Sequence, residues 1–93
     1  MIRFQWDPRK GTQNERKHAV SFSEAATVFR DPNAQLFDDD DHSQVEHREI
    51  LIGYSDRNRL LVVSFVERDD VIRVISARKV DRGEHENYEK ASR

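Results

Sequence analysis

The fold is decided by two apolar stretches, Leu60-Leu-Val-Val-Ser-Phe-Val66 and Val71-Ile-Arg-Val-Ile-Ser-Ala77. Each has the length of a β-strand and is rich in β-branched residues. The polar segment Arg68-Asp69-Asp70 separates them and has the composition of a tight turn. Together these segments predict a β-hairpin whose two-residue tip is Asp69 and Asp70.

The predicted hairpin has two unlike faces. With this tip, Val66 lies opposite Arg73 and Phe65 opposite Val74, and successive side chains alternate between the faces. The first face is apolar throughout, as is typical of a face buried under helices; it comprises Leu61, Val63, Phe65, Ile72 and Val74. The second is half apolar and carries guanidinium groups; it comprises Leu60, Val62, Ser64, Val66, Arg68, Arg73 and Ile75. We expect the function to lie on this second face.

Length and composition predict one small domain spanning residues 1–93. The residues are 35% hydrophobic and 37% charged, which predicts a small core and a highly charged, hydrated surface. The chain has no cysteine, which excludes a disulfide framework and a thiolate metal site and suits the cytoplasm. No apolar run approaches membrane-spanning length, so we expect a cytoplasmic protein without membrane contact.

The net charge of −2 conceals an uneven distribution of charge along the chain. Residues 1–30 hold six Lys/Arg against three Asp/Glu, whereas residues 31–56 hold one against eight. Residues 57–93 again favour the basic side, with nine against seven. Because the acidic block is confined to one segment, the folded surface can still present a basic patch to a nucleic acid.

The segment before the hairpin predicts a strand followed by two helices. Residues 2–6 alternate in the manner of a short edge strand, and Asp7-Pro8 begins a polar helix that runs to about Lys17. Ser21 begins a second helix, and Glu24 completes a capping-box pattern. The apolar stripe of that helix comprises Phe22, Ala25, Ala26, Val28 and Phe29, and Asp31-Pro32-Asn33 ends it.

The remaining segments predict further strands and a last helix. Residues 34–37 are a possible strand, and residues 47–54 are a strand with Arg48 and Tyr54 on the same face. Gly53 within that strand indicates a bulge or close packing by a neighbour. The charged segment from Asp81 to about Ser92 predicts a helix that docks weakly, because Tyr88 is its only large apolar residue. This order favours an α+β fold, with three or four antiparallel strands between the helix pair and the last helix.

Phosphodiester chemistry suits the side chains that remain at the ends of these elements. They are Lys17, His18, Glu46, Arg48, Glu67, Arg68, Arg73 and Arg78. Arginine can hold a phosphate and stabilise the charge of a pentacovalent transition state. A His or Glu can take the proton from a ribose 2′-hydroxyl, which is then the nucleophile. Strand parity, however, puts Arg73 and Arg78 on opposite faces unless the strand ends or twists near Ala77.

Simpler interpretations stay open for these residues. Arg73 has possible ion-pair partners in Glu46 and Glu49, and His18 suits the C-terminus of a helix for its charge alone. Residues 38–41 are four consecutive aspartates followed by His42, but carboxylates adjacent in sequence rarely converge on one ion. We therefore expect a solvated loop there, and neither a metal nor a cofactor.

Several separate motifs resemble those of the BrnT toxins. In order, they are Trp6-Asp7-Pro8-Arg9-Lys10, Asn14 to Phe22, Ala25 to Pro32, Arg48 to Ser55 and Ile72 to Arg78. Two positions depart from the family pattern. Ala19 stands where a glycine is common, and the last helix has His85 and Glu86 where a second arginine is usual.

The resemblance implies a RelE-like fold and a ribonuclease toxin of a type II toxin–antitoxin system. It also implies a ribbon-helix-helix antitoxin similar to BrnA, binding in a heterotetramer that contacts operator DNA only through the antitoxin. Carried over by position, the site residues are Lys17, His18, Arg48, Arg73 and Arg78, with Glu46 and Glu67 as acid/base candidates. We expect metal-independent cleavage of RNA that halts translation.

A rival interpretation is a non-catalytic binding module, since a half-apolar sheet face also suits an interface. A third is a degenerate toxin that retains the fold and acts as a co-repressor with its DNA-binding partner. Expression of the chain without its partner distinguishes them, because only an active toxin arrests growth.

Overall fold

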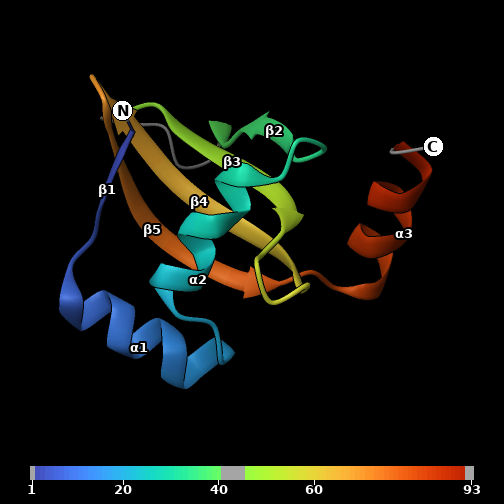
Figure 1. Ribbon diagram of the computed structural model, residues 1–93, viewed down its shortest axis with the longest axis horizontal. Helices are drawn as coiled ribbons and strands as arrows, with labels where there is room; N and C mark the ends of the chain where they lie inside the picture. The colour runs from blue at the N-terminus through green and yellow to red at the C-terminus, as the bar shows by residue number, and fades with distance from the viewer. Residues whose placement is uncertain (1, 41–45, 92–93) are drawn as a thin grey trace.

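The hairpin lies inside a five-stranded sheet of strand order β1-β5-β4-β3-β2 (Figure 1). The computed structural model describes residues 2–40 and 46–91. Its elements are β1 (Arg3–Gln5), α1 (Pro8–His18), α2 (Phe22–Thr27), the 3-10 helix η1 (Val28–Arg30), β2 (Gln35–Asp38), β3 (Arg48–Tyr54), β4 (Leu60–Arg68), β5 (Val71–Lys79) and α3 (Arg82–Ala91). Strands β2 to β5 are antiparallel, and β1 runs parallel to β5 at the edge. The predicted α+β class and element order are confirmed.

The hairpin pairs as the sequence predicts near its tip. Val66 lies opposite Arg73, and Phe65 lies opposite Val74. Asp69 takes the left-handed backbone conformation, with φ of 56°, which aspartate tolerates better than most residues. The turn therefore needs no glycine.

A β-bulge lies further from the tip and corrects one prediction. Ser64 pairs with Ser76, so Ile75 is an extra residue on β5. The extra residue shifts the alternation of β5 side chains between the two faces by one position. Ala77 therefore lies opposite Val63 and is buried, and Arg78 lies on the same face as Arg73. The prediction that Arg73 and Arg78 lie on opposite faces is wrong, because simple counting does not include the inserted residue.

The core lies between the first face of the sheet and the helix layer. All five residues predicted for that face are buried, and they pack with Val20, Phe22, Ala25 and Val28. Phe29 of η1 packs edge-on against Phe65, with ring centroids 4.9 Å apart. We call this the helix side of the sheet, and the opposite face the outer face.

The polar helix α1 is held to the sheet by one buried amide. Asn14 Nδ2 donates to the carbonyl oxygens of Val20 and Ala77 at 2.9 and 2.8 Å, and the Ala77 amide donates back to Asn14 Oδ1 at 3.1 Å. The side chain thus binds the peptide edge of β5 beyond the point where β1 ends. Asp7 caps the start of the helix, and Ala19 ends it in a left-handed conformation.

A buried carboxylate joins α2 to the turn between β3 and β4. Ser21 Oγ accepts from the Glu24 amide at 3.1 Å, as the capping box predicts. The Glu24 side chain instead accepts two hydrogen bonds at Oε2. Arg59 Nε donates one at 2.8 Å, and the Ser55 hydroxyl donates the other at 2.6 Å. The Arg59 hydrogen bond, opposed by burial and aided by Ser55, holds the pKa of Glu24 below its usual value.

Gly53 is required by close packing. A Cβ atom there would lie 2.8 Å from Ala34 Cβ and 2.9 Å from Asp31 Oδ2. The pairing of β3 with β4 is regular through this position, so the close-packing interpretation holds and no bulge is present.

The last helix docks through few contacts, as its sequence predicts, and these contacts centre on Tyr88. Tyr88 is only 4% exposed, and its hydroxyl donates to Asp31 Oδ2 at 3.2 Å or the Asn33 carbonyl at 3.1 Å. Its ring packs edge-on against Tyr54, whose hydroxyl donates to Glu89 at 3.1 Å. One aromatic side chain with a polar end therefore seats the helix. Figure 1 shows α3 and α1 at opposite ends of the molecule. Across the described residues, no helix has the length and hydropathy needed to cross a membrane.

Candidate functional site

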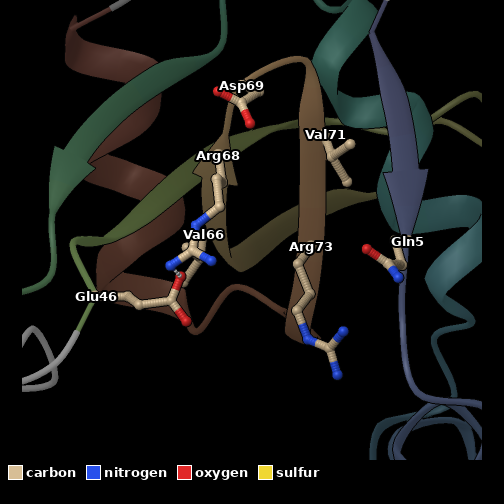
Figure 2. Close-up of a pocket in the computed structure, with 7 residues that line it drawn as sticks. All are labelled: Gln5, Glu46, Val66, Arg68, Asp69, Val71 and Arg73. Carbon is tan, nitrogen blue, oxygen red and sulfur yellow. Dashed lines mark ion pairs between the residues drawn. The ribbon is translucent and has the colours of Figure 1, made fainter.

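A groove of about 520 Å³ opens on the outer face near the hairpin tip. It is lined by Gln5, Glu46, Val66, Arg68, Asp69, Val71 and Arg73 (Figure 2). These residues come from β1, the segment just before β3, and both strands of the hairpin with its tip. The groove thus lies on the sheet face where the sequence predicts the function.

Strand register determines which side chains stand together here. Arg48, Val66, Arg73 and Gln5 occupy neighbouring positions in one row across β3, β4, β5 and β1. Two strand spacings separate the Cα atoms of Arg48 and Arg73, about 10 Å. Two arginine side chains on one face can close that gap on a single phosphate.

Glu46 supplies a carboxylate to this groove. Arg68 Nη2 lies 3.3 Å from Glu46 Oε2, and both side chains are largely solvent-accessible (Figure 2). The ion pair occupies Arg68, and Glu49 lies on the helix side, so neither predicted ion-pair partner binds Arg73. Within residues 2–40 and 46–91, Arg73 has no ion-pair partner, and its guanidinium is available to an anionic ligand.

Arg78 shares the outer face but lies nearer the last helix. Its two terminal nitrogens bind the two carboxylate oxygens of Glu84 at 2.8 and 3.0 Å. This hydrogen-bonded pair raises the pKa of Arg78 and lowers the pKa of Glu84, against the opposing effect of burial on each. Arg78 is not among the residues that line the groove.

The other residues predicted for the site lie elsewhere. Glu67 pairs across the hairpin with Ile72 and therefore faces the helix side. Lys17 and His18 form the last turn of α1, which is anchored beside Ala77 and not at the hairpin tip. Of the seven predicted residues, the structure brings Glu46 and Arg73 into one groove, with Arg48 beside them.

Sequence reasoning missed two residues that line the groove. Gln5 reaches it because β1 pairs with β5 in parallel, and a three-residue strand carries no signal for its partner. Asp69 was assigned only to the turn. Arg68, by contrast, is predicted on the same face as Arg73, because side chains alternate between the faces on each side of the hairpin tip.

Another cluster of side chains has the composition of a metal site. Ligand atoms of Asp38, His47 and Glu49 lie within 4.8 Å of one another, with His47 Nε2 2.9 Å from Asp38 Oδ1. The cluster is exposed, and the aspartate run contributes only Asp38 to it. Residues 41 and 42 of that run lie outside the described residues. Two of the three side chains already form an ordinary surface ion pair.

Comparison with known proteins adds a family. The model of a family described as "Ribonuclease toxin, BrnT, of type II toxin-antitoxin system" matches residues 6–84. The crystal structure of the Brucella abortus ribonuclease toxin BrnT has a similar fold, with a TM-score of 0.67 and 21% sequence identity. The match covers 88% of this chain and 100% of that one. No curated protein sequence matches the chain.

Proposed function

Because the chain belongs to the BrnT family of ribonuclease toxins of type II toxin–antitoxin systems, we propose that the outer-face groove is where it cuts RNA. The observation that carries this proposal is the grouping of Arg73 and Glu46 in one groove, with Arg48 in the same row of the sheet. Cations and a carboxylate side by side are what phosphodiester cleavage requires.

Arg73 holds the scissile phosphate in this proposal. It lies at the centre of the row, between Val66 and Gln5. Arg48 and Arg68 approach the same phosphate or its neighbour from the two sides of Val66. A guanidinium donates two parallel hydrogen bonds to phosphate oxygens, and these bonds strengthen as negative charge grows in the transition state.

Glu46 acts as the general base. It takes the proton of the ribose 2′-hydroxyl while the 2′-oxygen attacks phosphorus, and the 5′-oxygen leaves and gains a proton from water. The products are a 2′,3′-cyclic phosphate and a 5′-hydroxyl end. The ion pair with Arg68 holds the Glu46 carboxylate at the groove. In this proposal the RNA supplies the nucleophile, Glu46 the base and Arg73 the positive charge, and no step uses a metal ion.

The family also supplies a partner. A type II toxin is held by an antitoxin, and we propose that this antitoxin is a ribbon-helix-helix protein in a heterotetramer with the toxin. In that assembly the toxin meets operator DNA only through the antitoxin.

Arg73→Ala tests the site. We expect RNA cleavage by the purified variant to fall about 100-fold, because one donor to the transition-state charge is lost. Arg82→Ala is the matched control, since Arg82 is an arginine on the exposed surface of α3. Cleavage is measured on RNA in excess chelator, with circular dichroism to check the fold. Full activity of folded Arg73→Ala would remove this residue from the site, and loss of wild-type activity in chelator would end the metal-independent mechanism.

Growth arrest distinguishes the remaining alternative. Arg78 is bound to Glu84, and five of the seven predicted residues, Arg78 among them, are not part of the groove lining, as a degenerate toxin would allow. If the folded wild-type chain neither cuts RNA nor arrests growth without its antitoxin, it acts as a binding module or co-repressor.

A further inference from the structure

Among the described residues, the helix layer leaves one end of the sheet uncovered on the helix side. Beyond Phe29 a shallow groove of about 280 Å³ runs across the strands on this side. Ile2 and Leu36 stand at its two flanks, and Glu49 and Glu67 stand between them. We call this the helix-side groove.

Large apolar side chains are exposed along this groove. Leu36 is 58% exposed and Ile2 is 56% exposed, and Phe4 beside them is 36% exposed. Register places Leu36 next to buried Leu51, and Phe4 next to buried Ile72, so they share the face of the core. Residues of this kind, continuous with a core, mark a surface that a partner covers.

The charges in the groove all have one sign. Glu49 pairs with Phe65 and Glu67 with Ile72, so both carboxylates point to the helix side. No Lys or Arg is among the described residues that line it. Apolar side chains at the two ends with carboxylates between them fit a segment that carries apolar side chains toward its ends and Lys or Arg between them.

The dimensions favour a helix as the occupant. Ile2 and Leu36 lie at opposite edges of the sheet, four strand spacings or about 19 Å apart across the strands and about six residues or 20 Å apart along them. A helix of about 18 residues spans that diagonal of about 27 Å. Laid diagonally over the strands beyond Phe29, it would bury Ile2, Phe4 and Leu36 together.

We propose that the helix-side groove binds a basic amphipathic helix of the antitoxin. The proposal rests on the antitoxin partner that the family implies, and not on the cleavage mechanism. The catalytic groove proposed above lies on the opposite face of the sheet, so the two surfaces are separable by mutation. The binding mode is a helix in an apolar groove, with anchors at each end.

Leu36→Asp tests the apolar part of this surface. We expect it to weaken binding of purified cognate antitoxin at least 10-fold, measured by calorimetry, while RNA cleavage by the free variant stays at the wild-type rate. Phe37→Asp is the matched control: it is the next residue of β2, is 46% exposed and faces the other side. We expect it to change antitoxin affinity less than 2-fold.

The outcomes separate the alternatives. Equal loss in both variants means that the antitoxin adds a strand to the free edge of β2, and overturns the proposal. Unchanged affinity in both variants also overturns it. If Leu36→Asp leaves antitoxin affinity unchanged but reduces self-association in light scattering, the groove binds a second copy of this chain, and the proposal is overturned. Because affinity is measured directly, an inactive wild-type enzyme would contradict the cleavage mechanism and leave this result intact.

Glu49→Lys tests the electrostatic part. We expect weaker antitoxin binding and a smaller loss of affinity with added salt than in the wild type, because attraction to the basic helix is removed. An unchanged affinity and salt dependence would contradict a basic partner. Thermal unfolding confirms that each variant retains the fold.

Discussion

Ala19 has the most strained backbone among the described residues with a positive φ. The other two, Asn58 and Asp69, are of types that tolerate this conformation better than alanine does. Its φ of 58° and ψ of 32° lie in the left-handed region, where a Cβ atom is crowded. We therefore expect Ala19→Gly to raise the free energy of unfolding by about 0.5–1 kcal/mol, after the larger chain entropy of unfolded glycine is included.

Chemical denaturation measures this change. Ala26→Gly is the control, because Ala26 lies within helix α2 and the same substitution there lowers stability. A neutral or destabilising Ala19→Gly would mean that α1 ends differently in solution.

The ionised carboxylate of Glu24 contributes to the stability of the fold. Its pKa in the folded chain is lowered, so its contribution is complete above the ordinary carboxyl value of 4.5 and is lost as the pH falls through the lower folded pKa. At neutral pH we expect Glu24→Gln to lower the free energy of unfolding by about 2 kcal/mol, because Arg59 and Ser55 lose a charged acceptor.

Denaturation at a series of pH values checks the sign. The difference between wild type and Glu24→Gln should shrink as the pH falls below 4.5. Glu15→Gln, on the exposed surface of α1, should differ little from wild type throughout. A difference that grows in acid would contradict the assigned pairing.

At the scale of elements, the sequence predicts the helices and the antiparallel strands because their signals are local. Turn residues, caps and alternation of apolar side chains all lie within a few positions of each other. The bulge at Ile75 has no such signal, since an isoleucine suits a regular strand equally well. The parallel pairing of β1 with β5 depends on residues about seventy positions apart.

The docking of α3 centres on Tyr88, with the Tyr54–Glu89 and Arg78–Glu84 hydrogen bonds beside it, and this gives a further prediction. We expect Tyr88→Ala to release the helix, because Tyr88 is its only buried residue among those whose side chains are described. Amides of α3 should then exchange hydrogen at least tenfold faster, while amides of β4 stay protected. Asn87→Ala, exposed on the same helix, should leave exchange unchanged, and slow exchange in Tyr88→Ala would mean that other contacts hold α3.

At the scale of the whole molecule, the sheet separates two kinds of surface. Arginine side chains gather on the outer face, and carboxylates with exposed apolar residues gather on the helix side near the same end. The sequence predicts the face on which the outer groove lies, and of its seven site residues Glu46 and Arg73 line the groove, whereas Glu67, Lys17, His18 and Arg78 lie elsewhere. The kinds of side chain present suggest a reaction. Which of these side chains lie close together depends on the strand register and on how α1 is anchored to the sheet.

The binding of Asn14 to the peptide of Ala77 has a consequence for how copies of this chain can stack. One border of the sheet is closed, first by three residues of β1 and then by this amide. At the opposite border, no described strand pairs with the outer edge of β2. Two molecules that pair through their β2 edge strands would form a two-fold dimer. Such a dimer has no free edge strand of this kind left, so it cannot add further molecules to make a fibre.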